Sequence, residues 1–184
     1  MDFTFDVSES NIIWRCDLDR KESLRVISFM KKHFKRYLIT AENKTKTGTD
    51  CKEHFHLIGE QSKNSKKHIS DMFTKDFPEL TKKGKGGAHK KSAFKHLKEE
   101  YQFYYNFKNY KDSIYYCHEN QIITKSIQEE YYKKHLKLIE QKKVRHKFYH
   151  YCLQSNKNLK KYENIINLYI DYYDEQNKEP SSFD

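Results

Sequence analysis

The first part of the chain alternates between two hydrophobic periods. Residues 11–18 (NIIWRCDL) are rich in β-branched and apolar side chains, as is typical of a strand. Asp19 and Glu22 then match the spacing of a capping box, which marks the start of a helix. Apolar residues next recur at helical spacing, at Leu24, Ile27, Met30 and Phe34. The pattern therefore predicts a strand followed by a helix.

Two more strands are predicted at residues 37–42 (YLITAE) and 54–60 (HFHLIGE). The polar stretch between them, 43–53, contains a glycine and turns the chain back. In such an antiparallel pair, the end of the first strand lies beside the start of the second. A helix over residues 65–77 follows and ends before Pro78. The predicted order is thus β-α-β-β-α.

The next part of the chain is less regular. Residues 82–91 (KKGKGGAHKK) predict a flexible basic loop without the GxxxxGK[ST] spacing of a phosphate-binding loop, which excludes that motif. We expect a further strand over 92–97, and the aromatic run 101–107 indicates neither state. Residues 109–118 predict a short helix that ends at Asn120, a residue tolerant of left-handed backbone.

Residues 126–143 open with a second capping-box pattern, SIQE, and predict a helix. Another helix is expected through Leu159 to Tyr173, and the closing DEQNKEPSSFD is polar enough for disorder. We therefore predict an α+β fold, with a mainly antiparallel sheet flanked by helices and a C-terminal helical extension. The expected divisions are a domain at 1–125, an extension at 126–178 and a disordered tail at 179–184.

Charge is distributed unevenly in this chain of 184 residues with a formal net charge of +10. Residues 61–98 hold eleven lysines against three acidic residues, whereas 126–184 hold eleven basic against nine acidic residues. Such a concentration indicates a polyanionic partner, although a solvated lysine-rich surface gives the same pattern. The candidate nucleic-acid contacts are Lys82, Lys83, Lys85, Lys90 and Lys91.

The four cysteines, Cys16, Cys51, Cys117 and Cys152, are widely spaced and form no CxxC pair. They indicate free thiols in a reducing compartment rather than a zinc ribbon or a disulfide framework. The sequence has no signal peptide and no apolar run of membrane-spanning length. We expect an intracellular protein that does not enter a membrane.

His54-Phe55-His56 is the strongest candidate for chemistry. Alternate strand residues share a face, so His54 and His56 project together while Phe55 points the other way. Two imidazoles and one carboxylate make a divalent-metal site, and Glu42 at the end of the preceding strand is the natural third ligand. The alternative is an ordinary strand with two solvent-facing histidines.

Tyr115-Tyr116-Cys117-His118 offers a nucleophile for a metal-bound phosphate. On the predicted helix His118 lies at i+3 from Tyr115, where it can orient the tyrosine or the phosphate. A tyrosine-rich helix that only contributes to the core is the alternative.

Together these motifs resemble the HUH endonuclease domain of Rep proteins from circular single-stranded DNA viruses of the circovirus, nanovirus and geminivirus type. Residues 12–19 are similar in place to the first Rep motif, Glu42 with 54–56 to the metal-binding second, and 115–123 (YYCHENQII) to the third, YxxK. The resemblance implies an RRM- or ferredoxin-like HUH fold and a divalent metal, Mn²⁺ or Mg²⁺. It also implies nicking and rejoining of single-stranded DNA at a replication origin through a 5′-phosphotyrosine.

The third motif allows two alignments. With Tyr115 as the nucleophile, His118 takes the place of the family's lysine; with Tyr116, Glu119 takes it, and a carboxylate repels phosphate. The first is favoured, and the second stays open.

The stretch between the second and third motifs is longer than in a compact member of the family. The helicase domain that follows in Rep, and through which Rep can oligomerise, is missing. If the chain comes from a eukaryotic virus, the resemblance implies that the protein acts in the host nucleus. A single-tyrosine HUH transposase and a non-catalytic binder of single-stranded nucleic acid remain alternatives.

Overall fold

A computed structural model describes residues 3–45, 47–61, 65–81, 94–118 and 121–154. Its strands are β1 (Ser8–Cys16), β2 (Arg36–Lys44), β3 (Asp50–Glu60), β4 (Lys95–Leu97) and β5 (Ile114–Cys117). Its helices are α1 (Ser23–His33), α2 (Lys66–Asp76), α3 (Glu100–Tyr104) and α4 (Lys125–Gln154), with 3₁₀ turns η1 (Arg20–Glu22), η2 (Pro78–Thr81) and η4 (Tyr105–Phe107). The predicted α+β class is confirmed, including the C-terminal helix.

The five strands form one sheet in the order β4-β1-β3-β2-β5, and every neighbouring pair is antiparallel. β2 and β3 are paired in the predicted way, with Glu42 directly opposite His54. Directly opposed residues share a face of the sheet. The register therefore fixes which side chains can meet.

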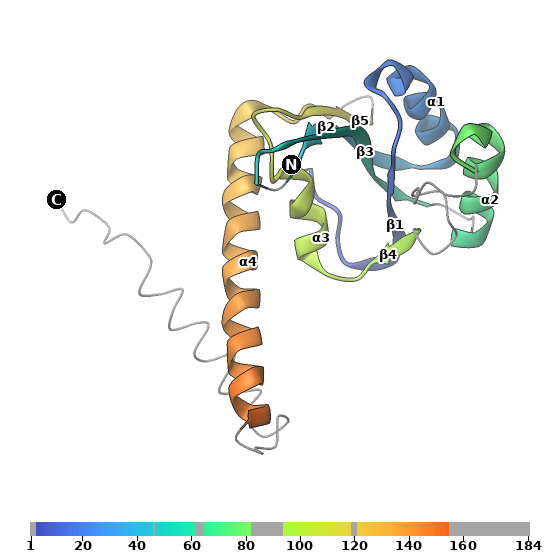
Figure 1. Cartoon of the computed structure of the whole chain (residues 1–184). Coiled ribbons are helices and arrows are strands. Elements are labelled where there is room, and N and C mark those ends of the chain that lie inside the picture. The colour runs from blue at the N-terminus through green and yellow to red at the C-terminus, as the bar shows by residue number, and fades with distance from the viewer. Residues whose placement is uncertain (1–2, 46, 62–64, 82–93, 119–120, 155–184) are drawn as a thin grey trace. The chain divides into compact units, whose positions relative to one another are not determined.

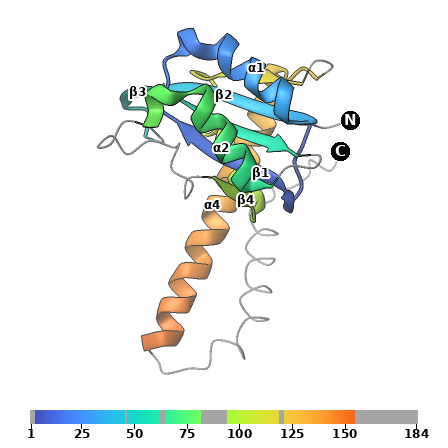
Figure 2. The same cartoon turned by 90° about the vertical axis from the view of Figure 1, so that its right-hand side faces the viewer.

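One face of the sheet carries the hydrophobic core. Helices α1 and α2 lie together over this face (Figure 2), and Val26, Phe29 and Phe73 pack there against Phe55 and Leu57. Phe55 and Leu57 are buried in this core cluster, which confirms that they point away from His54 and His56. A methyl group on Gly59 would meet the Phe34 ring, so the close approach of these segments needs glycine at that position.

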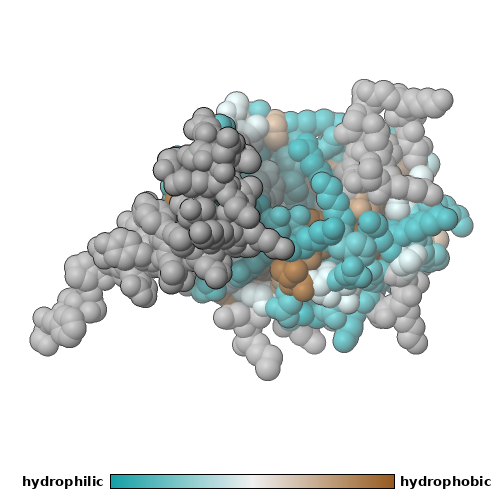
Figure 3. Space-filling view, turned by 90° about the horizontal axis from the view of Figure 1, so that it is seen from below, coloured by the Kyte–Doolittle hydropathy of each residue, from teal (hydrophilic) through white to brown (hydrophobic). Residues whose placement is uncertain are grey.

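The opposite face is covered by α3, η4 and the first turns of α4. Tyr131 of α4 is completely buried against Phe103 and Phe107, and its hydroxyl donates a 3.0 Å hydrogen bond to the Phe3 carbonyl. Chain contacts divide the molecule into two compact units, Met1–His135 and Leu136–Asp184, so the boundary falls within α4. The described surface seen from below is mostly hydrophilic (Figure 3).

The predicted helix over 109–118 is wrong. Residues 114–117 form strand β5, which pairs with β2 from Leu38↔Cys117 to Ala41↔Ile114. A four-residue apolar segment has too few positions to reveal its period, and pairing with a strand distant in sequence decides its state. Consequently no tyrosine helix at 115–118 crosses the sheet.

Both predicted capping boxes also differ from the structure. Asp19 precedes η1 without a side-chain cap, whereas α4 begins at Lys125, where the Thr124 hydroxyl accepts the Ile127 N–H. α2 begins after Ser65, whose hydroxyl caps the helix by accepting the His68 N–H. The predicted helix at 159–173 and the tail lie outside the described residues.

Candidate metal centre

Three ligand atoms from two adjacent strands meet on the face opposite the core. Glu42 Oε1 lies 3.0 Å from His54 Nε2 and 2.6 Å from His56 Nε2. One ligand atom from each of the three residues lies within 4.8 Å of the others. Glu42 and His54 are buried, and His56 is mostly buried. The sequence-predicted triad is therefore brought together, and this buried group can hold a metal ion.

The backbone carbonyl of Lys52 orients the His54 ring within this group. His54 Nδ1 lies 2.8 Å from the Lys52 carbonyl oxygen, which can only accept, so Nδ1 carries the proton. His54 Nε2 then faces Glu42 Oε1 at 3.0 Å. The same carbonyl fixes the ring orientation, as outer-shell partners of metal-bound histidines do. Two nitrogens and one oxygen are a ligand set that fits a divalent ion.

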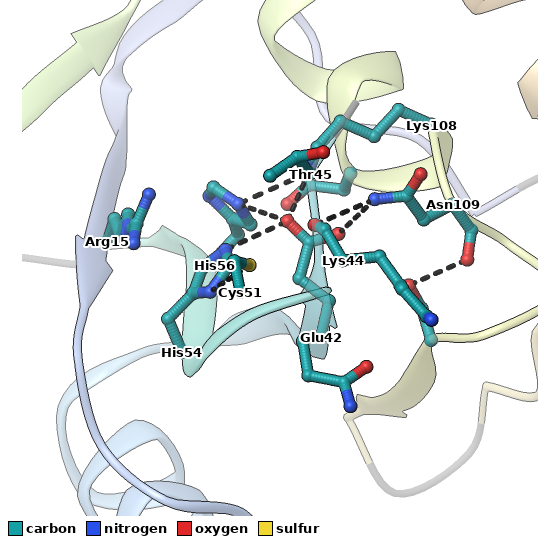
Figure 4. A network of polar contacts seen from close by, with 12 residues as sticks. Arg15, Glu42, Lys44, Thr45, Cys51, His54, His56, Lys108 and Asn109 are labelled. Atoms are coloured by element: carbon teal, nitrogen blue, oxygen red, sulfur yellow. Dashed lines mark hydrogen bonds and ion pairs between the residues drawn. The ribbon is translucent and has the colours of Figure 1, made fainter. Parts of the chain in front are cut away.

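A lysine and an asparagine complete the surroundings of Glu42. Figure 4 shows His54 and His56 on one side of the carboxylate, with Lys108 and Asn109 on the other. Lys108 Nζ contacts Glu42 Oε1 and lies 3.4 Å from His56 Nε2. The Asn109 amide donates to Glu42 Oε2 at 3.3 Å and to the Lys44 carbonyl at 3.0 Å. Glu42 is thus held by both its oxygens.

These contacts set the ionisation of the centre. Burial raises the pKa of Glu42, but the contacts with His54 and His56 and the positive charge of Lys108 outweigh it and hold the pKa well below its usual range. Burial lowers the pKa of His56 to about 4, against the opposing effect of Glu42. A carboxylate beside a neutral imidazole is the protonation state that metal binding requires.

Tyr105 lies beside this centre. Its ring centroid is 5.5 Å from that of His56, edge to face, and 4.2 Å from Lys108 Nζ. On its other side, Tyr105 contacts Tyr101 and His135, with centroid distances of 6.0 and 5.8 Å. Burial and the Glu42 charge raise the pKa of Tyr105. The phenol therefore needs a nearby cation before it can act as a nucleophile.

A cavity of about 280 Å³ opens next to the triad. Its walls include His56 and Tyr105, together with Tyr101 and two cationic side chains, Arg15 and Lys95. Arg15 is directly opposite His56 in the sheet and pairs with Asp17 at 3.0 Å. The cavity combines aromatic walls with positive charge, which suits a nucleotide.

The predicted catalytic residues are distributed over both faces. Tyr115 is opposite Thr40, which is itself opposite His56, so Tyr115 shares the metal face. Its ring stacks on Phe107 at 5.1 Å, its hydroxyl donates to the Asn106 carbonyl at 3.2 Å, and burial raises its pKa.

Tyr116 lies on the core face, where its hydroxyl is 3.4 Å from Ser23 Oγ. His118 contacts Tyr37, with ring centroids 5.9 Å apart, and not the triad. Its predicted helical alignment with Tyr115 is wrong, because these residues lie in and just after β5. The five predicted lysines at 82–91 lie outside the described residues.

Sequence reasoning missed Tyr105, Lys108, Asn109 and His135. The spacing Tyr105-Asn106-Phe107-Lys108 is itself YxxK and could have identified the first two. Asn109 and His135 carry no local signal, because Asn109 lies in the turn after η4 and His135 lies on α4, and neither belongs to a motif.

The fold and site define an α+β protein with a buried Glu-His-His candidate metal centre. No family model matches the chain, and no curated protein or solved structure matches it either. Among the described residues, no helix has the length and apolar character needed to cross a bilayer.

Proposed function

We propose that the protein is a metal-dependent endonuclease that cuts single-stranded DNA with Tyr105 as its nucleophile. The convergence of Glu42, His54 and His56 beside Tyr105 and Lys108 carries this proposal. Tyr105 and Lys108 have the YxxK spacing of the third Rep motif, which Tyr115 and His118 lack. Action at a replication origin rests on the Rep resemblance alone.

Each residue has a defined role in this proposal. Mn²⁺ or Mg²⁺ held by the triad supplies polarisation of a phosphoryl oxygen. The Tyr105 oxygen attacks phosphorus, the bond to the 3′ oxygen breaks, and the 5′ phosphate stays on Tyr105. The phenol proton passes to solvent, and the departing 3′ oxygen takes one up. The Lys108 ammonium offsets the phosphate charge, and reversal of the step rejoins strands.

A covalent adduct is the decisive observation. The protein is incubated with Mn²⁺ and a pool of labelled single-stranded oligonucleotides, denatured, and examined for DNA that stays attached. Tyr105→Phe removes one oxygen and keeps the ring, so we expect it to abolish the adduct while DNA binding survives. Tyr115→Phe and Tyr116→Phe are matched controls that retain it.

Peptide mapping of the trapped adduct identifies the nucleophile. DNA on Tyr115 or Tyr116 would return the role to the residues first suggested by the sequence. Absence of any adduct, with binding intact, would favour a non-catalytic binder that uses the aromatic cavity beside His56. A single-tyrosine transposase makes the same adduct and differs in cutting mobile-element ends.

A further inference from the structure

We infer that Lys108 is a cation that competes with a divalent ion for the Glu42 carboxylate, so that nucleic-acid phosphate and metal promote each other's binding. The inference deepens the proposed function, because it describes the regulation of the same site.

The first step is the convergence of three groups on one atom. Glu42 Oε1 contacts both histidine Nε2 atoms and Lys108 Nζ, and Nζ is also 3.4 Å from His56 Nε2. The Lys108 side chain is 5% exposed and that of Glu42 is fully buried. An ammonium that contacts a metal-binding carboxylate and a metal-binding imidazole takes the place of the ion's charge.

The second step is electrostatic. A divalent ion on these ligands and an ammonium on the same carboxylate oxygen are like charges in a buried site, where screening by water is weak. Binding of the ion therefore requires the ammonium to leave Glu42. Lys108 can do so because its charge sits on a flexible four-carbon chain.

The displaced Lys108 ammonium can move toward the cavity beside Tyr105. The Tyr105 ring, 4.2 Å from Nζ, lines the cavity that also contains Arg15 and Lys95. A phosphate bound among these cations attracts the Lys108 ammonium away from Glu42 and frees the carboxylate for metal. Metal and phosphate then bind cooperatively, and by linkage each strengthens the other equally.

Mn²⁺ titration calorimetry tests this exchange without relying on cleavage. The variant is Lys108→Met, which keeps the aliphatic chain and removes the charge. Lys44→Met is the matched control, since Lys44 lies two residues from Glu42 but pairs with Asp50 at 2.6 Å. We expect Lys108→Met to bind Mn²⁺ about 10-fold more tightly, and Lys44→Met to change by less than about 2-fold.

A second measurement uses the unaltered Lys108. In a Tyr105→Phe background, which cannot form the adduct, a saturating single-stranded oligonucleotide should tighten Mn²⁺ binding by about 5-fold or more. The same oligonucleotide should have no such effect once Lys108→Met is added. If Lys108→Met fails to fold without metal, the effect of the oligonucleotide on Mn²⁺ binding in the Tyr105→Phe variant still tests the exchange.

The outcomes separate the two proposals. Unchanged or weaker Mn²⁺ binding by folded Lys108→Met, or no coupling between oligonucleotide and Mn²⁺ while Lys108 is present, overturns the exchange even if the protein forms adducts. Tighter Mn²⁺ binding and coupling that depends on Lys108, in a protein that never forms an adduct, keep the exchange and remove the proposed endonuclease.

Discussion

Lys108 Nζ lies 4.2 Å from the centroid of the Tyr105 ring, and the same nitrogen contacts Glu42. The 3₁₀ turn η4 begins at Tyr105 and is followed by Lys108, so it places the Tyr105 ring beside the ammonium that contacts Glu42 on β2. Residues at i and i+3 of a 3₁₀ helix lie in line, so the pair faces the centre as a unit. This relationship explains how the Glu42 carboxylate can stay ionised in a buried site, because the Lys108 ammonium balances its charge.

The triad should bind a divalent ion, and each of its three ligands should be needed for tight binding. We expect His54→Ala, His56→Ala and Glu42→Gln each to weaken Mn²⁺ binding by at least about 100-fold, beyond the effect of losing an outer-shell partner. The core behind Phe55 is untouched by the histidine changes, so circular dichroism should stay native. Calorimetry measures the affinity.

His96→Ala is the matched control, since His96 lies on β4 and contacts the Glu9 carbonyl at 2.7 Å. Mn²⁺ affinity should be the same as for the unaltered protein. Loss of binding in this variant, or retention in His54→Ala, would contradict the assignment of the ligands.

Tyr115 should contribute to stability more than to chemistry. Its hydroxyl bonds to the Asn106 carbonyl, and its ring stacks on Phe107. Tyr115→Phe should therefore lower the free energy of unfolding by about 0.5–1.5 kcal/mol, the usual net value of one hydrogen bond. Urea denaturation measures this change, and the adduct assay should give a normal yield. A lost adduct in a stably folded variant would make Tyr115 part of the chemistry.

The fold was predictable where hydrophobic periodicity is long. β1 to β3, α1 and α2 appear within a few residues of their predicted bounds, and the strand pairing that joins Glu42 to His54 follows from one turn. The triad was predictable for the same reason, because alternation along a strand fixes the face of each side chain.

The second half of the site was not predictable in this way. The run from Tyr101 to Phe107 is aromatic at five of its seven positions, so it shows no clear period from which to infer a helix face. β5 is only four residues long, and its pairing with β2 is long-range. His135 reaches Tyr101 and Tyr105 through packing of α4, which no local pattern encodes.

His135 should make stability depend on pH. Burial, with the nearby Lys108 charge, lowers the pKa of His135 to about 4 from an ordinary 6.5. Between those values the unfolded chain binds the proton and the folded one does not, so the stability is full above about pH 6.5 and falls as pH drops toward 4. The loss should reach roughly 2–3 kcal/mol.

His135→Phe keeps a ring against Tyr101 and cannot be protonated. Chemical denaturation in chelator, repeated from pH 7 to 4, should show a flatter profile for this variant than for the unaltered protein. Parallel profiles would mean that His135 titrates alike in both states.

The basic segment at 82–91 should govern the salt dependence of DNA binding. Neutralising Lys82, Lys83, Lys85, Lys90 and Lys91 removes five cations. Each phosphate contact on a single strand releases about 0.7 counterion, so the log–log slope against salt should fall by roughly 3 to 4. Fluorescence anisotropy at several salt concentrations measures it, and an unchanged slope would show that these lysines are only solvated.

The first turns of α4 should be required for the sheet unit to fold. Tyr131 fills a buried site against Phe103 and Phe107, and its hydroxyl caps the Phe3 carbonyl. Tyr131→Ala should cost about 3–5 kcal/mol of unfolding free energy, as other large aromatic truncations do, and Tyr131→Phe only about 0.5–1.5 kcal/mol.

A chain shortened to end at Lys125 loses Tyr131 and His135 together and should be largely unfolded. A chain that ends a turn after His135 keeps Tyr131 and His135 with their contacts and should melt cooperatively near the temperature of the unshortened protein. Equal melting of both shortened chains would mean that α4 is an appendage, and that the sheet unit ends at Lys125.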